Sequence, residues 1–282
     1  MEQKLKKVLQ YFSLFNYYPT FDEIYTFFPV KIDKKTLIEL LKRQKYTPPE
    51  YSISSPLVIP TEVEGSSQIS KRKLSSWRYK VYIKWLSIFP QIKLVGLSGS
   101  IAMMNADLDD DIDLFIITAK NRLFTARFLA TTLAFIIGLK RGIGLEKAPN
   151  KVCLNLFFDE SKLTVPKIKK TEFVAHEILQ MKPIISKGNV YQQFLKANRW
   201  VFKLFPNAVP SVIPSDPPTG GESRDLFRKI SHFVRNDKIS NYFEKLLKNL
   251  QLKLINRHQT TEIITASQLW FHPVDFGKKM KF

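Results

Sequence analysis

The feature that most constrains this chain is the segment over residues 93–118, KLVGLSGSIAMMNADLDDDIDLFIIT. An apolar, strand-like run over 93–97 breaks at the small residues 98–100, and a short helical piece (IAMMNA) follows. An acidic loop over 107–110 then leads into a second strand-like run over 111–118. Apolar runs of this length, bounded by small and polar residues, indicate buried strands. The segment therefore predicts two core strands joined through a turn, a short helix and an acidic loop.

Two carboxylates lie at the start of the second predicted strand. Because side chains alternate along a strand, Asp111 and Asp113 share one face, whereas Ile112 and Leu114 point into the core. Backbone positions two residues apart on a strand are separated by about 7 Å. Carboxylates at that spacing can converge on the metal ions of a phosphoryl-transfer site, which lie roughly 3.5–4 Å apart.

The turn after the first predicted strand is suited to phosphate. Gly99 has no side chain, so its backbone can approach a phosphate group closely. Ser100 stands where a helix begins, and backbone N–H groups there favour anions. Together, the turn and the neighbouring strand predict a triphosphate site beside Mg²⁺ ligands.

These residues resemble the signature of a known family. Gly99-Ser100, followed twelve positions after the glycine by Asp111-x-Asp113, resembles the motif of the DNA polymerase beta-like nucleotidyltransferase superfamily. The whole chain is also similar to an uncharacterised group of archaeal and bacterial nucleotidyltransferase-domain proteins. That wider resemblance rests on the N-terminal YFSLFNYYPTFDEI, on KVCLNLFF and on the tail FHPVD. The most specific part of the family resemblance lies in residues 94–118.

The resemblance implies roles for particular residues. Gly99 and Ser100 would hold the nucleotide phosphates, and Asp111 and Asp113 would bind the catalytic metals. The superfamily usually adds a third carboxylate on a later strand of the same sheet.

This chain departs from the family pattern at that third carboxylate. The matching strand spans residues 151–158, and the matching position holds Asn155. An amide oxygen ligates Mg²⁺ but brings no charge and is no base. Asp159 or Glu160, at the end of this strand, is the candidate substitute.

The N-terminal region predicts three helices. Apolar residues recur at helical spacing over 2–16, Thr20 with Glu23 forms a capping-box pattern, and a third helix begins near Asp33. Residues 51–63 alternate loosely and hold two prolines, which predicts a short hairpin at a sheet edge. Three helices and a hairpin follow the order of a winged-helix domain.

The rest of the chain divides by composition. A basic, aromatic helix is predicted over 67–88, helices over 122–139, 171–181 and 189–204, a proline-rich linker over 206–221 and a long amphipathic helix over 225–257. The apolar run 128–139 is too short to cross a membrane, for which about 20 residues are needed, so we expect a buried core helix.

The predicted fold class is accordingly α/β (α+β), with a small mixed sheet flanked by helices. The expected organisation is a winged-helix-like domain over 1–66, a nucleotidyltransferase core over 67–165, a helical extension over 166–205, a linker over 206–224 and a C-terminal helix and tail over 225–282.

Charge and cysteine content restrict the class of partner and compartment. The formal net charge is +19, which favours nucleic acid, nucleotides or an anionic membrane surface; low-GC coding bias toward lysine explains it equally well. A single cysteine excludes an internal disulfide framework, and no secretory signal is evident, so we expect a cytoplasmic protein without a transmembrane segment. The apolar stripe of the helix over 225–257 packs either internally or in a homodimer.

Other candidate residues have structural explanations beside the functional ones. Arg127 follows the Asp111-x-Asp113 strand and is either a triphosphate clamp or a structural charge on a helix. Cys153 lies between apolar residues in the middle of a strand, which indicates an inert buried thiol. Four histidines lack ligand spacing and are interpreted as structural or exposed: His176, His232, His258 and His272.

Three functions remain open at this stage. The first is a Mg²⁺-dependent enzyme that moves a nucleoside monophosphate from an NTP to an acceptor hydroxyl or phosphate and releases pyrophosphate. The second is a basic, nucleic-acid-binding regulator with a non-catalytic transferase core, which Asn155 and the charge favour. The third is an enzyme that nucleotidylates a small molecule or a protein.

Overall fold

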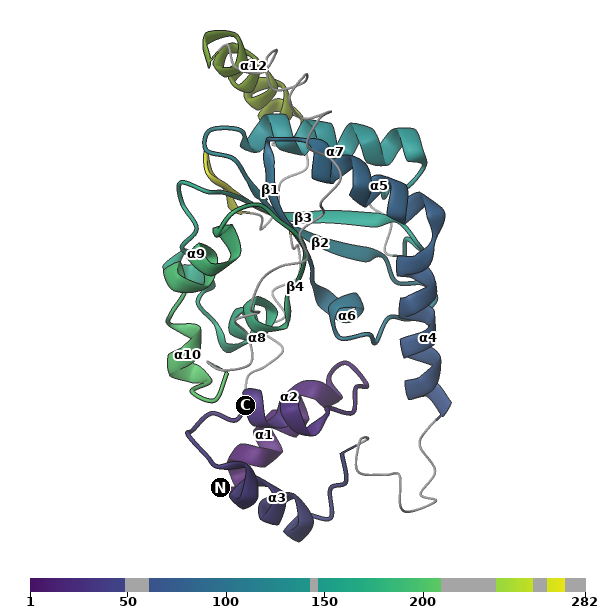
Figure 1. The fold of residues 1–282 in the computed structure, drawn as a ribbon, viewed down its shortest axis with the longest axis vertical. Coiled ribbons are helices and arrows are strands. Elements are labelled where there is room, and N and C mark those ends of the chain that lie inside the picture. The colour runs from purple at the N-terminus through teal and green to yellow at the C-terminus, as the bar shows by residue number, and fades with distance from the viewer. Residues whose placement is uncertain (49–60, 143–146, 209–236, 256–262, 272–282) are drawn as a thin grey trace.

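The computed structural model describes residues 1–48, 61–142, 147–208, 237–255 and 263–271 (Figure 1). A six-stranded mixed sheet with the order β4-β1-β2-β3-β6-β5 lies at its centre, between helices. Its strands are β1 (Ile92–Leu97), β2 (Ile112–Thr118), β3 (Val152–Asp159), β4 (Lys182–Ser186), β5 (Ile263–Ile264) and β6 (Gln268–Trp270). The expected mixed α/β class with a mixed sheet is confirmed.

The register of β2 decides which predicted residues meet. β2 pairs antiparallel with β1 and parallel with β3, and helix α7 (Leu123–Ile137) connects the parallel pair. Asp113 pairs with Cys153 at one end of the two strands, and Thr118 pairs with Asp159 at the other. Side chains at the start of β2 therefore lie near the start of β3 and far from its end.

The two faces of the sheet bury separate hydrophobic clusters. Ile112, Leu114 and Ile116 pack with α7 and with α5 (Trp77–Ile88) on one face. Phe115 and Phe158 lie on the other face with the cluster that covers α8 (Glu172–Gln180) and α9 (Val190–Ala197). The predicted alternation along β2 is confirmed. The acidic residues at its start lie on the α8 side, because Asp113 shares its face with Phe115.

Three N-terminal helices form as the sequence predicts: α1 (Glu2–Ser13), α2 (Phe21–Thr26) and α3 (Lys34–Arg43). The capping box is present, since Thr20 Oγ1 accepts a hydrogen bond from Glu23 N at 3.2 Å and the Glu23 carboxylate accepts one from Thr20 N at 2.8 Å. Asp33 caps α3 by accepting a hydrogen bond from Thr36 N at 2.9 Å. Local capping chemistry thus sets the first residue of α2 and of α3.

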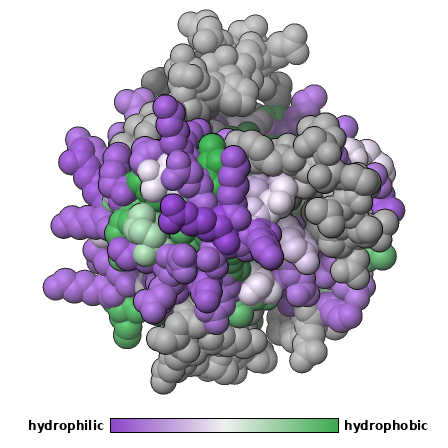
Figure 2. Space-filling model, turned by 90° about the horizontal axis from the view of Figure 1, so that it is seen from below, coloured by the Kyte–Doolittle hydropathy of each residue, from purple (hydrophilic) through white to green (hydrophobic). Residues whose placement is uncertain are grey.

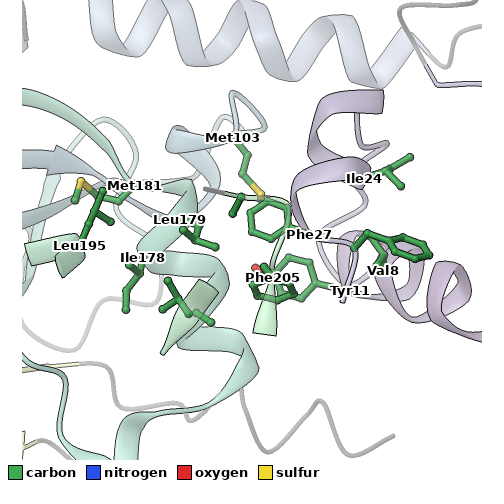
Figure 3. Packing of buried hydrophobic residues seen from close by; sticks show 14 of the residues in the cluster. Val8, Tyr11, Ile24, Phe27, Met103, Ile178, Leu179, Met181, Leu195 and Phe205 are labelled. Carbon is green, nitrogen blue, oxygen red and sulfur yellow. The ribbon is translucent and has the colours of Figure 1, made fainter. Parts of the chain in front are cut away.

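The N-terminal helices share their core with the sheet side of the molecule. The rings of Tyr11 and Phe27 stack on His176 of α8, with centroids 3.5 and 4.3 Å away, and the ring of Phe205 lies edge-on to the same imidazole. Figure 3 shows Tyr11, Phe27 and Phe205 gathered between the N-terminal helices and α8. His176 is therefore a structural residue, as expected, and burial lowers its pKa. His232, His258 and His272 lie outside the described residues.

The start of the predicted linker belongs to this core. Asn207 is buried, accepts a hydrogen bond from Ile32 N at 3.2 Å and donates one to Phe28 O at 3.1 Å. The expectation of an extended linker is therefore wrong for residues 206–208, because the Asn207 side chain satisfies backbone groups after α2. Residues 209–224 lie outside the described residues.

The predicted hairpin is not supported where it can be checked. Residues 61–63 belong to helix α4 (Thr61–Ser75), which contradicts a strand there, and residues 51–60 lie outside the described residues. The single helix predicted over 67–88 is two helices, α4 and α5. They separate at Ser76, whose hydroxyl accepts a hydrogen bond from Tyr79 N at 3.4 Å and caps α5.

Helix α7 holds most of the longest apolar run of the sequence. The expectation that this run is buried is wrong for one face, because Phe128, Phe135 and Ile136 are exposed, whereas Ala130 and Ala134 are buried. Across the part of the chain that the structure describes, none of the helices combines the length and the apolar character that crossing a membrane requires.

The C-terminal half adds elements that the sequence did not indicate. The predicted helix over 189–204 breaks after α9, at Asn198, and resumes as α10 (Val201–Leu204). Strands β4, β5 and β6 were not predicted. Helix α12 (Asp237–Ile255) is the described part of the helix predicted over 225–257. The remaining helical pieces are α6 (Gly99–Ala102) and the 3₁₀ turn η2 (Lys167–Lys169).

Candidate functional site

Three potential metal ligands converge at the start of β2 and β3. Asp111 and Asp113 each offer a carboxylate oxygen and Cys153 offers its sulfur, and these atoms all lie within 4.8 Å of one another. Asp113 and Cys153 are register partners across the parallel pair, and Asp111 is two residues earlier on the same strand face. We call these three residues the acidic cluster. The two aspartates converge as predicted, and the Cys153 sulfur lies close to both of them.

The glycine turn packs directly on the acidic cluster. Gly99 has φ +62°, and a Cβ built there would lie 2.6 Å from Asp113 Oδ2. The turn is anchored because Ser98 N donates a hydrogen bond to Asp113 O at 3.1 Å. Only glycine combines this backbone conformation with such close approach to a carboxylate.

The acidic loop is held in place from two sides. Ser100 Oγ donates a hydrogen bond to Asp110 Oδ2 at 2.7 Å, and Asp107 N donates to the same oxygen at 3.0 Å. Lys73 of α4 donates to Leu108 O at 2.9 Å and to Asp110 O at 2.6 Å. The Ser100 hydroxyl therefore orders the loop, and one lysine of the predicted basic helix has a structural contact here.

A guanidinium lies beside the acidic cluster, and it belongs to Arg141. Arg141 Nη1 donates a hydrogen bond to Asp111 Oδ2 and another to Cys153 Sγ at 3.3 Å. The side chain of Asp111 is 15% exposed, so this ion pair is partly shielded from water. The arginine balances one of the two carboxylate charges.

The second carboxylate carries a perturbed pKa. The pKa of Asp113 is raised to about 8, first by burial and then by the charges of Asp111 and Glu177, against the opposing effect of Arg141. Burial also raises the pKa of the Cys153 thiol well above its ordinary value, and the two aspartates add to this effect. Both groups therefore favour their protonated forms until a cation compensates the charge.

Glu177 supplies a third carboxylate that the sequence analysis did not identify. It projects from α8, its carboxylate accepts a hydrogen bond from the backbone N–H of Gly99, and it acts electrostatically on Asp113. Burial raises the pKa of Glu177 to about 7. Its position on a helix that follows the core, far along the chain from residues 99–113, left no local signal in the sequence.

Asn155 lies beside Asp113, as its strand position predicts. Its Nδ2 donates a hydrogen bond to Asp113 Oδ1 at 3.1 Å, and its Oδ1 accepts one from Cys153 Sγ at 2.8 Å. The amide oxygen is thus engaged by the thiol, and Asn155 positions Asp113 in this arrangement.

The two substitutes considered for the third carboxylate lie elsewhere. Asp159 accepts a hydrogen bond from Asn121 N at 2.7 Å, and Glu160 accepts one from Lys120 N at 3.0 Å, both at the opposite end of β2. The expectation that either residue completes the site is wrong, because a parallel neighbour strand carries its end away from the start of β2.

Arg127 is not brought to the acidic cluster. It donates a hydrogen bond from Nη1 to Gln251 Oε1 at 2.6 Å and lies over the ring of Phe271, 4.9 Å from its centroid. Burial lowers its pKa to about 10. The expected clamp role near Gly99 and Asp111 does not fit this position, since α7 begins beyond the far end of β2. The guanidinium that contacts the acidic cluster belongs to Arg141.

A cleft opens beside the acidic loop. It has a volume of about 460 Å³ and is lined by Ile69, Asp107, Leu108, Asp109, Asp110, Asp111, Lys147 and Ala148. This size lies within the range of small-molecule sites. Because its lining is rich in carboxylates, an anionic ligand requires a cation to enter with it.

Comparisons of the chain with protein-family models, with curated proteins and with solved structures gave no match.

Proposed function

We propose that this protein is a Mg²⁺-dependent nucleotidyltransferase that moves a nucleoside monophosphate from an NTP to an acceptor hydroxyl or phosphate and releases pyrophosphate. The observation that carries the proposal is the convergence of the Asp111 and Asp113 carboxylates against the Gly99 turn. Two carboxylates at this spacing, beside a backbone turn without a side chain, are the elements that phosphoryl transfer needs.

The donor set fits Mg²⁺. Hard oxygen ligands from one or two carboxylates, completed by phosphate oxygens and water, are its usual environment in nucleotide sites. Asp111 and Asp113 would hold the ion, and the Cys153 thiol, which burial keeps protonated, is the weaker partner for a hard cation. When bound, Mg²⁺ neutralises phosphate charge and stabilises the transition state.

The surrounding residues have positioning roles in this proposal. Asn155 fixes the Asp113 carboxylate through a hydrogen bond, and Glu177 fixes the Gly99 turn. The cleft beside the acidic loop would receive the substrate. Rigid placement of ligands contributes strongly to phosphoryl transfer, because catalysis there is mainly positioning and charge stabilisation.

The test is transfer of label from an α-³²P NTP, with Mg²⁺, to total RNA and total protein from the expression host, distinguished by nuclease and protease digestion. The Asp111→Asn/Asp113→Asn variant should abolish transfer. The matched control is Glu39→Gln/Glu172→Gln, which removes the same charge from exposed positions of α3 and α8 outside the cleft and should retain transfer. Equal transfer by wild type and the first variant would refute the proposal.

A second candidate function is a nucleic-acid-binding regulator with a non-catalytic core. Two observations favour it: Arg141 already balances the Asp111 charge, and α3 buries its apolar face while exposing a basic one. The exposed basic residues are Lys34, Lys35, Lys42, Arg43 and Lys45. Most of the described residues on the face seen in Figure 2, on the side of the N-terminal helices, are hydrophilic.

This candidate predicts DNA or RNA binding that weakens steeply with salt. Reversing the charge of Lys35 and Lys42 should reduce binding, whereas the same reversal at Lys4 and Lys7, on exposed positions of α1, should have little effect. Nucleic-acid binding that is absent or insensitive to salt would exclude this second candidate function.

A further inference from the structure

Helix α12 docks on α7 through polar side chains, and Leu247 and Leu252 pack against the hydrophobic cluster of this face. The Glu244 carboxylate accepts hydrogen bonds from Phe124 N and Thr125 N, both at 2.8 Å, at the first turn of α7. Gln251 accepts a hydrogen bond from Arg127 Nη1 at 2.6 Å and donates one to Phe124 O at 2.8 Å. Glu244 and Gln251 lie two turns apart on one helix face. These contacts fix the rotation of α12 about its axis.

This rotation turns the apolar side of α12 to solvent. The side chains that are exposed there form a stripe, which we call the α12 stripe: Ile239 (54% exposed), Tyr242 (68%), Phe243 (52%), Leu246 (41%), Leu250 (53%) and Leu254 (60%). Steps of three and four residues keep them on one side of the helix. An amphipathic helix normally buries such a stripe, so its exposure indicates an interaction surface.

The charges beside the stripe are basic. Lys245 and Lys253 are exposed on α12, and Glu244, the one acidic residue whose side chain is described on this helix, faces α7. The whole chain has a net charge of +19. Lysines that flank leucine and aromatic side chains on one helix are typical of helices that lie in a membrane interface.

We propose that the α12 stripe binds the surface of an anionic lipid bilayer, with the helix lying in the plane of the headgroups. Charge distinguishes this occupant from a second copy of the chain. Two copies packed stripe to stripe would bring two helices of like, positive charge together, whereas anionic headgroups attract Lys245 and Lys253. Tyr242, at the edge of the stripe, has the amphipathic ring that favours the interface.

The experiment is sedimentation of the full chain with vesicles of phosphatidylserine and phosphatidylcholine, and with vesicles of phosphatidylcholine alone. Wild type should bind the first and not the second. Phe243→Ser/Leu246→Ser/Leu250→Ser should weaken binding by at least about tenfold, because each removed side chain contributes buried apolar area. The matched control is Tyr18→Ser/Leu108→Ser/Ile168→Ser, which changes three exposed apolar residues outside α12 and should bind like wild type.

A charge variant provides the second arm. Lys245→Glu/Lys253→Glu leaves the stripe intact and should also weaken binding to the anionic vesicles by about tenfold or more. Thermal unfolding of each variant establishes that it is folded. Binding that is equal on both vesicle types, or unaffected by the stripe variant, overturns the proposal. A dimer in gel filtration that the stripe variant dissociates, without vesicle binding, also overturns it and assigns the stripe to a second copy.

Discussion

Replacing Gly99 by alanine should damage both the stability and the ion binding of this protein. Gly99 has φ +62°, a conformation that costs a residue with a Cβ about 1–2 kcal/mol. The new methyl group would also lie 2.6 Å from Asp113 Oδ2, so the carboxylate must shift. Displacing it breaks the 3.1 Å hydrogen bond with Asn155 and crowds a buried site, which adds about 1–3 kcal/mol.

A second glycine separates these two effects. Gly188 has the same φ of +62°, and nothing lies within 4 Å of a Cβ built there. Gly188→Ala should therefore cost only the backbone contribution of about 1–2 kcal/mol, whereas Gly99→Ala should cost about 2–5 kcal/mol in total. Urea denaturation of both variants measures the difference.

Ion binding is the second readout. Titration of Mn²⁺, a paramagnetic substitute for Mg²⁺, should show weakened binding for Gly99→Ala and unchanged binding for Gly188→Ala. If the two variants lost equal stability and both bound Mn²⁺ like wild type, the close packing of the turn on Asp113 would have no part in the site.

Three further predictions concern neighbouring residues. Burial raises the pKa of Glu177 to about 7, so the folded chain binds more protons than the unfolded chain between about pH 4.5 and 7. The free energy of unfolding should therefore fall as pH rises through that range. Glu177→Gln should reduce this pH dependence, whereas Glu172→Gln, on an exposed position of α8, should leave it unchanged. Arg141→Gln should tighten Mn²⁺ binding several-fold, because the guanidinium no longer competes with the ion for the Asp111 carboxylate. Arg122→Gln should leave Mn²⁺ binding unchanged. Weaker binding by Arg141→Gln would contradict the competition between Arg141 and the ion. Glu244→Ala should lower the free energy of unfolding by about 1–2 kcal/mol, because it removes the cap of α7; thermal unfolding measures this loss. A loss near zero would mean that the contact between Glu244 and α7 is not formed in solution.

Local patterns predicted the parts of the fold that local chemistry determines. Apolar spacing located α1, the capping box located α2 and the Asp33 N-cap located α3. The alternation over 111–118 predicted β2 with its carboxylates on one face. In each case the residues that decide the structure lie within a few positions of one another. The position of Asn155 beside Asp113 was implied by the family resemblance.

Features that depend on distant pairing could not be predicted in this way. Strand β4 (KPIIS) is short and holds a proline, and it becomes a strand because β1 pairs with it. Glu177 and Arg141 reach the site through helix packing and a loop after α7, and neither lies in a motif. Arg127 was expected near the nucleotide because it follows β2, yet α7 begins at the far end of that strand. Parallel pairing of β2 with β3 likewise carried Asp159 and Glu160 away from the acidic cluster.

Calorimetric titration of the four NTPs, with and without Mg²⁺, tests the central claim most directly. The measurement compares wild type with Asp111→Asn/Asp113→Asn and with the control Glu39→Gln/Glu172→Gln, whose two positions are exposed and lie outside the cleft. We predict Mg²⁺-dependent binding of at least one NTP to wild type and to the control, and its loss in the first variant. Absence of binding to every NTP, or binding that survives replacement of Asp111 and Asp113, would contradict the nucleotidyltransferase account.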